Sequence, residues 1–160
     1  VYVCEHNDKG AMGLTLTVPL DMDQHELLTQ MKYEHIMPSL ADQPVMAGGP
    51  VSTDRGFVLH TPISGLQSSL RLAPDLMVTT SLDILTKICH GETPEQYIVC
   101  LGYAGWEAGQ LEQEVLENSW LTLPADNDLI FASPWETRWL SATRGLGIDI
   151  WQVAPQAGHA

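Results

Sequence analysis

Three blocks of this sequence place histidine, arginine, tryptophan and acidic residues next to glycines. They run from residue 4 to 13, from 48 to 60 and from 102 to 120. Glycine-containing loops often present functional groups, because glycine adopts backbone conformations that are closed to other residues. We therefore expect the three blocks to build an interaction surface. Its candidate ligand-binding residues are Glu5, His6, Arg55, His60, Trp106, Gln110 and Glu114.

The first block contains a cysteine and a histidine two positions apart. On a strand, Cys4 and His6 would project to one face while Glu5 points to the other. An imidazolium beside the thiolate would make Cys4 a redox-sensing or nucleophilic thiol. We favour the simpler interpretation of a half-buried cysteine beside a histidine that caps a turn, because the sequence locates no third group to orient a catalytic pair. The other histidines show no metal-ligand spacing, so we expect no metal site.

In the second block, Gly48-Gly49-Pro50 precedes a group of hydroxyl side chains and Arg55. A guanidinium can hold a carboxylate or phosphate through two parallel hydrogen bonds, so Arg55 is a candidate for binding an anionic group. The alternative is an ion pair with one of the chain's own carboxylates. His60 ends the strand that we predict after Arg55, from where it would face the same loop.

The third block lies between a predicted buried strand and a predicted helix, which is the usual setting of phosphate-binding loops. It matches neither the G-x-G-x-x-G nor the P-loop pattern, and its helix carries glutamates and no lysine. We therefore expect no nucleotide and no other cofactor. Trp106 would supply an apolar wall, and Gln110 and Glu114, four residues apart on one helix face, would orient hydrogen bonds. Such a polar row is also typical of a solvated helix face.

Size and charge narrow the functional classes. A chain of 160 residues with 44% hydrophobic content fits one domain with its own core. Its net charge of -13 disfavours direct binding to nucleic acid or to anionic membrane surfaces. No apolar run reaches membrane-spanning length, and three cysteines without a CxxC pair suit the reducing cytoplasm. The chain begins at Val1 in a strand-like segment with no initiator Met, which we interpret as the loss of native residues ahead of it.

Hydrophobic periodicity predicts hairpins mixed with strand–helix units, which is typical of an α+β domain with a mixed sheet. A capping box at Thr80 and Asp83 and a helix start at Ser133-Pro134, with a stop at Gly145, mark two of the helices. The expected strands are 1–6, 11–18, 45–47, 56–60, 76–79, 97–101, 120–123, 129–132 and 148–153, and the expected helices are 23–35, one from about residue 80, 110–118 and one from 133.

The three blocks also carry a family resemblance. Cys4-Glu5-His6-Asn7, Gly48-Gly49-Pro50 and Gly102-Tyr103-Ala104-Gly105-Trp106 resemble the YqgE/AlgH family of bacterial proteins, and the similarity extends over essentially the whole chain. The resemblance implies a single domain over residues 1–160, with a mixed twisted sheet that curls towards a pseudo-barrel and helices packed on it. Family members are mostly described as uncharacterised, and some are labelled as transcriptional regulators. One departure is Thr17, where the family often has Asn.

These observations lead to three functional hypotheses. The first is a non-enzymatic binding or regulatory module of the cytoplasm. It would act through a protein partner or a small anionic ligand and not by direct DNA binding. Helix faces rich in tryptophan also permit a homodimer. The second is a hydrolase or transferase acting on a small anionic ligand at the glycine-loop cleft, with His6 or His60 as base and Glu114 as its partner. The third is a thiol redox sensor at Cys4.

Overall fold

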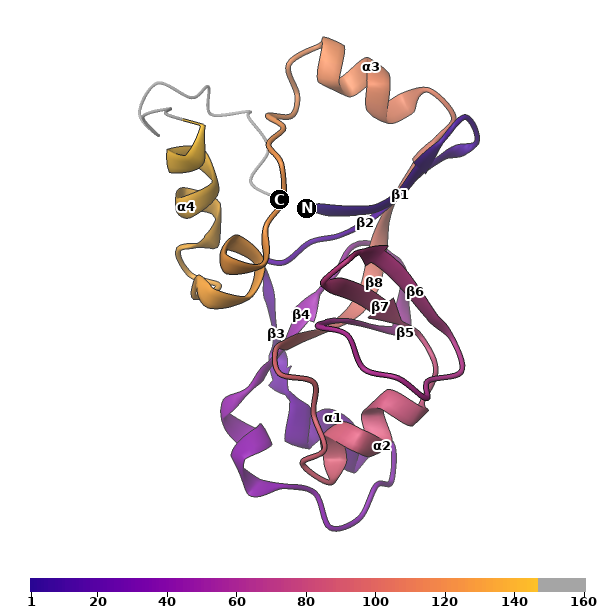
Figure 1. The fold of residues 1–160 in the computed structure, drawn as a ribbon, viewed down its shortest axis with the longest axis vertical. Helices are drawn as coiled ribbons and strands as arrows, with labels where there is room; N and C mark the ends of the chain where they lie inside the picture. Colours follow the sequence, from indigo (N-terminus) through magenta and orange to yellow (C-terminus); the bar gives the residue numbers. More distant parts are fainter. Residues whose placement is uncertain (147–160) are drawn as a thin grey trace.

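The computed structural model describes residues 1–146, which form one domain around a strongly curled sheet (Figure 1). The strands pair in the order β1-β2-β8-β5-β7-β6, while β4 pairs with β8 and β3 with β4. All of these pairs are antiparallel except β4–β8, so the sheet is mixed, as expected. Curling brings it close to a closed barrel. The strands are β1 (Tyr2–Asn7), β2 (Gly10–Leu14), β3 (Pro19–Asp23), β4 (Pro44–Ala47), β5 (Val51–His60), β6 (Ser69–Ala73), β7 (Leu76–Thr79) and β8 (Tyr97–Glu107).

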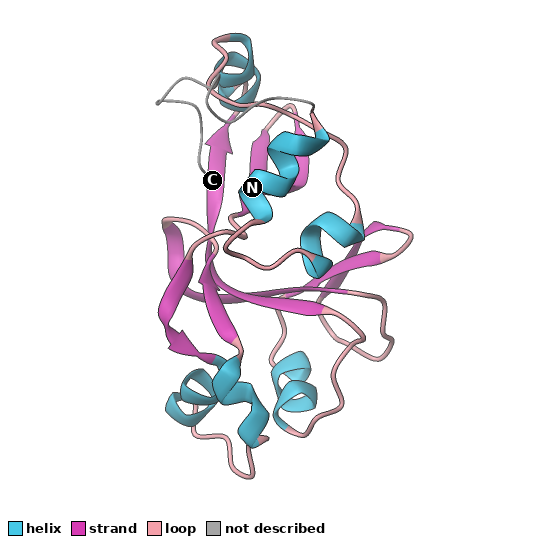
Figure 2. Ribbon diagram, turned by 90° about the vertical axis from the view of Figure 1, so that its left-hand side faces the viewer, coloured by secondary structure: helices cyan, strands magenta, loops and turns pink. Residues whose placement is uncertain are grey.

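Helices lie at the two ends of the molecule, with the sheet between them (Figures 1 and 2). At one end are α1 (Gln24–Gln30) and α2 (Asp83–Cys89), with the 3-10 helix η1 (Pro38–Asp42) beside α1. At the other end are α3 (Gln110–Leu116), the short π-helix η2 (Asp128–Ala132) and α4 (Arg138–Gly145). No helix within residues 1–146 combines the length and the apolar character needed to cross a membrane.

Two hydrophobic clusters lie on opposite faces of β5 and β8, because side chains alternate between the two faces of a strand. Phe57, Leu59 and Cys100 belong to the cluster inside the curled sheet. Val58 and Val99 belong to the cluster that packs against α1 and α2. The second half of β5 and the first half of β8 are therefore buried on both faces, and Cys100 is a core residue, as the apolar run around it predicts.

The largest correction to the sequence analysis concerns the glycine blocks. Residues 102–107 continue β8 and do not form a loop. A Cβ on Gly102, whose φ is +76°, would lie 2.4 Å from the carbonyl oxygen of Gly49, and a Cβ on Gly49 would lie 2.1 Å from the backbone of Tyr103. These glycines are therefore required because two backbone segments touch there, which is a structural role and not a ligand-binding one.

Several element predictions were also wrong. The second arm of the opening hairpin ends at residue 14 and not at 18, and strands β3 and β6 were not expected. Residues 120–123, predicted as a strand, have no regular structure, and residues 129–132, also predicted as a strand, belong to η2. Helix α1 stops before Lys32 and His35, which both adopt positive φ. Thr80 does not cap α2, and the last helix begins at Arg138, although it ends at Gly145 as predicted. Short apolar runs do not distinguish strands from other buried segments. The strand expected at 148–153 lies outside the described residues.

Candidate functional site

An open groove of about 690 Å³ runs between β1, β2, β5 and β8, and we call it the Arg55 groove. Glu5 from β1, Arg55 from β5 and Trp106 from β8 line it together with Phe57 and Tyr103. The structure thus brings three of the predicted site residues to one concave surface, although they are far apart in the sequence. The surface is made of strands and not of the glycine loops from which it was predicted.

Aromatic rings support the arginine in this groove. The guanidinium carbon of Arg55 lies 5.4 Å from the ring centroid of Phe57, a cation–π contact. Phe57 in turn meets Tyr103 edge to face, with centroids 5.6 Å apart and an interplanar angle of 68°. Within residues 1–146 Arg55 makes no ion pair, so its expected alternative partner, a carboxylate of the chain itself, is not found there. Its exposed charge thus lies over a floor formed by two aromatic rings.

The net charge of the residues that line the Arg55 groove differs from the net charge of the whole chain. Lys9 and Arg55 contribute two cations, and Glu5 and Glu107 contribute two carboxylates. The groove is therefore formally neutral in a protein whose net charge is -13. An acidic ligand meets less repulsion here than over the average surface.

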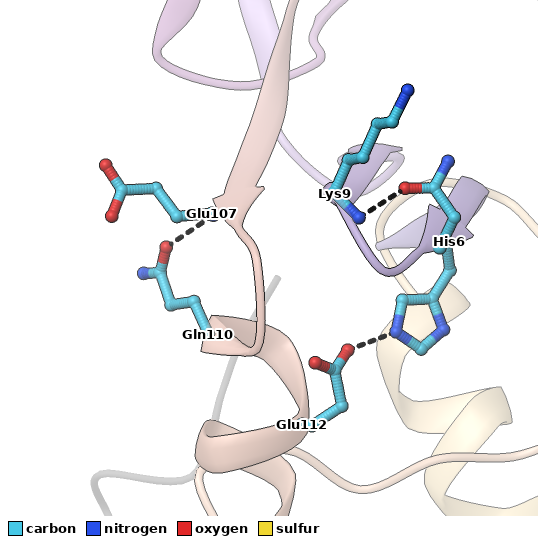
Figure 3. A network of polar contacts seen from close by, with 6 residues as sticks. His6, Lys9, Glu107, Gln110 and Glu112 are labelled. Atoms are coloured by element: carbon cyan, nitrogen blue, oxygen red, sulfur yellow. Dashed lines mark hydrogen bonds and ion pairs between the residues drawn. The ribbon is translucent and has the colours of Figure 1, made fainter.

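Gln110 and Glu114 hold α3 against the end of β8. One carboxylate oxygen of Glu114 accepts hydrogen bonds from the indoles of Trp106 (3.2 Å) and Trp120 (2.9 Å), and the other accepts from the Gln110 amide (3.0 Å). The Gln110 carbonyl oxygen accepts from the backbone N–H of Glu107 at 2.9 Å (Figure 3). The hydrogen bond from Trp120, followed by those from Trp106 and Gln110, lowers the pKa of Glu114 against the opposing effect of desolvation. Both residues are thus occupied in positioning α3.

His6 points towards α3, where its ring nitrogen Nε2 contacts the carboxylate of Glu112 (Figure 3). Cys4 instead lines a small pocket together with Glu5. The prediction that Cys4 and His6 share a face is therefore wrong. The cause is an irregularity in the β1–β2 register between Val3 and Glu5, which changes the alternation of side chains at that point.

Cys4 is half buried, and its thiol is free. Desolvation, with a smaller contribution from the Glu5 carboxylate, raises the pKa of Cys4 to about 12. Reactive cysteines normally have a lowered pKa and a cationic neighbour. The redox-sensor hypothesis consequently gains no support from the surroundings of this thiol.

His60 is fully buried and does not line the Arg55 groove. Its Nδ1 is 2.7 Å from the carbonyl oxygen of Thr61, so this nitrogen carries the hydrogen, and Nε2 accepts from the Thr79 hydroxyl at 2.7 Å. The hydroxyl of Ser69, 2.5 Å from that of Thr79, completes the chain as donor. Burial lowers the pKa of His60, which keeps the ring neutral. His60 is thus a hydrogen-bonded core residue.

The acid–base pair of the enzyme hypothesis is not assembled in the described part of the chain. His6 contacts Glu112 and not Glu114, and His60 lies in the core. Within residues 1–146, no group of three or more His, Cys, Asp or Glu side chains is arranged to hold a metal ion.

Sequence reasoning missed several residues around the site. Arg55 and Phe57 are two apart on one strand, so a longer predicted β5 would have placed them on the same face. Tyr103 was hidden by the interpretation of its segment as a loop. For Glu112 the sequence carries no such signal, because its contact with His6 joins positions 106 residues apart. Trp120 lies only six residues after Glu114, but α3 ends between them, so helical spacing does not define their contact.

Comparisons with known proteins agree with this fold. A family model described as AlgH-like matches residues 1–151. A UPF0301 protein of Shewanella loihica is 51% identical over 162 residues, covering 100% of this chain and 87% of the relative, and one of Pseudoalteromonas translucida is 51% identical over 160 residues, covering 99% and 86%.

Two solved structures resemble the chain as well. The solution structure of AlgH from Pseudomonas aeruginosa superposes with a TM-score of 0.79 at 45% identity, covering 99% of this chain and 84% of that one. A crystal structure of a protein from Corynebacterium diphtheriae gives a TM-score of 0.66 at 19% identity, covering 97% and 78%, and shows a shared fold.

Proposed function

The chain belongs to the AlgH-like family, and on that premise we propose that it is a binding module of the bacterial cytoplasm that uses the Arg55 groove to hold an acidic segment of a protein partner. The regulatory role in this proposal is indirect: the module acts through that partner and does not itself bind DNA. Three free cysteines and the strongly acidic composition support the cytoplasmic, protein-directed form of the proposal.

The observation that carries the proposal is the exposed guanidinium of Arg55. It lies over Phe57 and has no carboxylate partner within residues 1–146. A guanidinium held over an aromatic ring keeps its outward N–H groups oriented, so less side-chain entropy is lost when a carboxylate binds. The adjacent ring of Tyr103 offers apolar contact to the residue beside that carboxylate.

The shape of the groove favours a peptide over a small molecule. It is long and open, and it extends along strands from the β1–β2 turn to the middle of β5. Small-molecule sites usually bury most of the ligand surface in a closed cavity. A chain segment with a Glu or Asp next to a large apolar residue matches the Arg55 guanidinium and the aromatic floor.

A peptide-display selection against the full 160-residue chain tests this proposal. We expect the selected peptides to be enriched in acidic residues next to apolar ones. The substitution Arg55→Ala should weaken their binding about tenfold or more, because a hydrogen bond to a charged group contributes about 1.5–3 kcal/mol. Arg71→Ala is the matched control, since Arg71 is exposed but lies on β6 outside the groove.

Two results would contradict the proposal. One is a selection without acidic enrichment, and the other is unchanged affinity in Arg55→Ala. Thermal unfolding of both variants checks that the substitutions leave the fold intact, as expected for exposed side chains.

A further inference from the structure

A second cavity lies at the start of β1, between the first residues of the chain and α4. We propose that this cavity, which we call the Arg138 cavity, binds a small carboxylate with a compact apolar group. It has a volume of about 170 Å³ and is enclosed by the first residues of the chain, the segment after β2, the stretch from 120 to 130 and α4. It shares no lining residue with the Arg55 groove.

The wall of the Arg138 cavity is mostly apolar. An apolar cavity of about 150 Å³ is large enough to hold benzene, so this one accepts a ring or a short alkyl chain of similar size. A nucleotide or a sugar phosphate is too large and too polar for such a wall. Its apolar lining residues include Trp120, Leu121, Leu123, Leu129, Ala142 and Leu146.

Two polar atoms in this apolar wall have no hydrogen-bond partner within residues 1–146. Arg138 donates through Nη1 to the Leu16 carbonyl oxygen and through Nη2 to that of Ser133 at 3.0 Å, but its buried Nε finds no acceptor in the described part of the chain. The hydroxyl of Thr17 is also buried and has no partner among these residues. Both residues line the cavity. Nearly all buried polar groups in native proteins have partners, so an acceptor bound in this cavity could satisfy both groups.

The chemistry of these two groups identifies the ligand as an acceptor. Arg138 has only N–H donors, and the Thr17 hydroxyl can donate as well. Arg138 forms no ion pair within residues 1–146, and the carboxylate of Glu136 acts on it only from beyond ion-pair distance. A partly buried cation without a counter-ion is costly, and desolvation lowers the pKa of Arg138 accordingly. A bound carboxylate would neutralise the charge and accept from both residues.

The cavity contains its own spectroscopic probes, because Trp120 and Trp139 are among its lining residues. Trp120 also donates to Glu114, so the cavity adjoins the contact that holds α3 to β8. Binding should therefore change the intrinsic tryptophan fluorescence.

The test uses benzoate and hexanoate, with benzamide and hexanamide as neutral analogues of the same shape. Each is titrated into the full 160-residue chain while tryptophan fluorescence and calorimetry are recorded. We expect the acids to bind at least about tenfold more tightly than the amides, because only the acids form charge-assisted hydrogen bonds. Equal affinity for acid and amide, or no binding of either acid at millimolar concentration, would overturn the proposal.

Three variants separate the parts of the proposed site. Arg138→Met should abolish the preference for the acid, but Arg138 also supports the backbone at Leu16 and Ser133, so this variant is open to misfolding. Thr17→Val removes only the hydroxyl and should weaken acid binding several-fold. Ala142→Phe fills the cavity and should prevent binding. Arg71→Ala, on β6 and outside both sites, should leave the affinity for the acids unchanged. Because the Arg138 cavity shares no lining residue with the Arg55 groove, failure here is distinguishable from failure of the proposed function. Undiminished binding by Thr17→Val and Ala142→Phe would refute the assignment.

Discussion

The indole N–H of Trp106 donates to the Glu114 carboxylate over 3.2 Å, and this contact ties the end of β8 to α3. The same carboxylate oxygen also accepts a hydrogen bond from the indole of Trp120. The rings of Trp120 and Trp106 meet edge to face, with their centroids 5.9 Å apart. Because Trp106 is buried and lines the Arg55 groove, Glu114 contacts one wall of the groove without lining it.

We predict that Glu114→Gln lowers the free energy of unfolding by about 1 kcal/mol at neutral pH, since a neutral acceptor replaces a charged one. The pKa of Glu114 is lowered by folding, so its ionisation stabilises the native state above the ordinary glutamate pKa of about 4.3, and this contribution is lost as the pH falls. The difference between wild type and variant should therefore shrink in acid. Urea unfolding, followed by tryptophan fluorescence at neutral and acidic pH, measures this difference in the free energy of unfolding. A difference that is the same at both pH values would contradict the stabilising role of the Glu114 carboxylate.

A second prediction concerns the close contact of Gly49 and Gly102. Gly102→Ala should destabilise the protein by about 3 kcal/mol or more, because the added Cβ meets the Gly49 carbonyl oxygen and the positive φ disfavours alanine. Gly56→Ala is the matched control on β5, where a Cβ would meet nothing within 4 Å. Chemical denaturation of the two variants makes the comparison. Equal stability of both would show that the two segments separate easily.

Stability should also depend on the protonation of His60. Its pKa is lowered in the folded state, so the unfolded chain binds the proton more readily. Stability is then fully present above the ordinary histidine pKa of about 6.5 and decreases below it, by at most about 1.4 kcal/mol per pH unit for one proton. In His60→Gln this part of the decrease should vanish, whereas the exposed His90→Gln should retain it. The free energies of unfolding of the wild type and the two variants, measured at several pH values between neutral and mildly acidic, test this prediction.

Cys4 should react slowly with iodoacetamide in the native protein. A pKa of about 12 leaves about a thousandfold less thiolate at neutral pH than in an ordinary cysteine. In urea, all three cysteines should be alkylated, as mass spectrometry of tryptic peptides would report. Glu5→Gln should speed the native reaction, because it removes a charge that opposes the thiolate. Native alkylation of Cys4 as fast as that of a free thiol would instead favour the redox-sensor hypothesis.

The α+β class, the opening hairpin, strands β4 and β7, the second half of β5 and the first half of β8 could be predicted from the sequence. Alternating apolar residues and strong turn signals are local properties, and they carry this information directly. The family resemblance drawn from the three blocks is confirmed by the AlgH-like match and by the solved AlgH structure.

The sequence by itself thus determined the class of the fold, its family and the candidate residues Glu5, Arg55 and Trp106 that meet in one groove. Only the tertiary structure decided that the glycines serve backbone contacts, that His60 belongs to the core and that Glu114 holds two tryptophans. It also brought Thr17 and Arg138, more than a hundred residues apart in the chain, to the lining of one cavity. The physical reason is that periodicity reports which face of an element is buried, whereas the partner on that face depends on how distant elements pack.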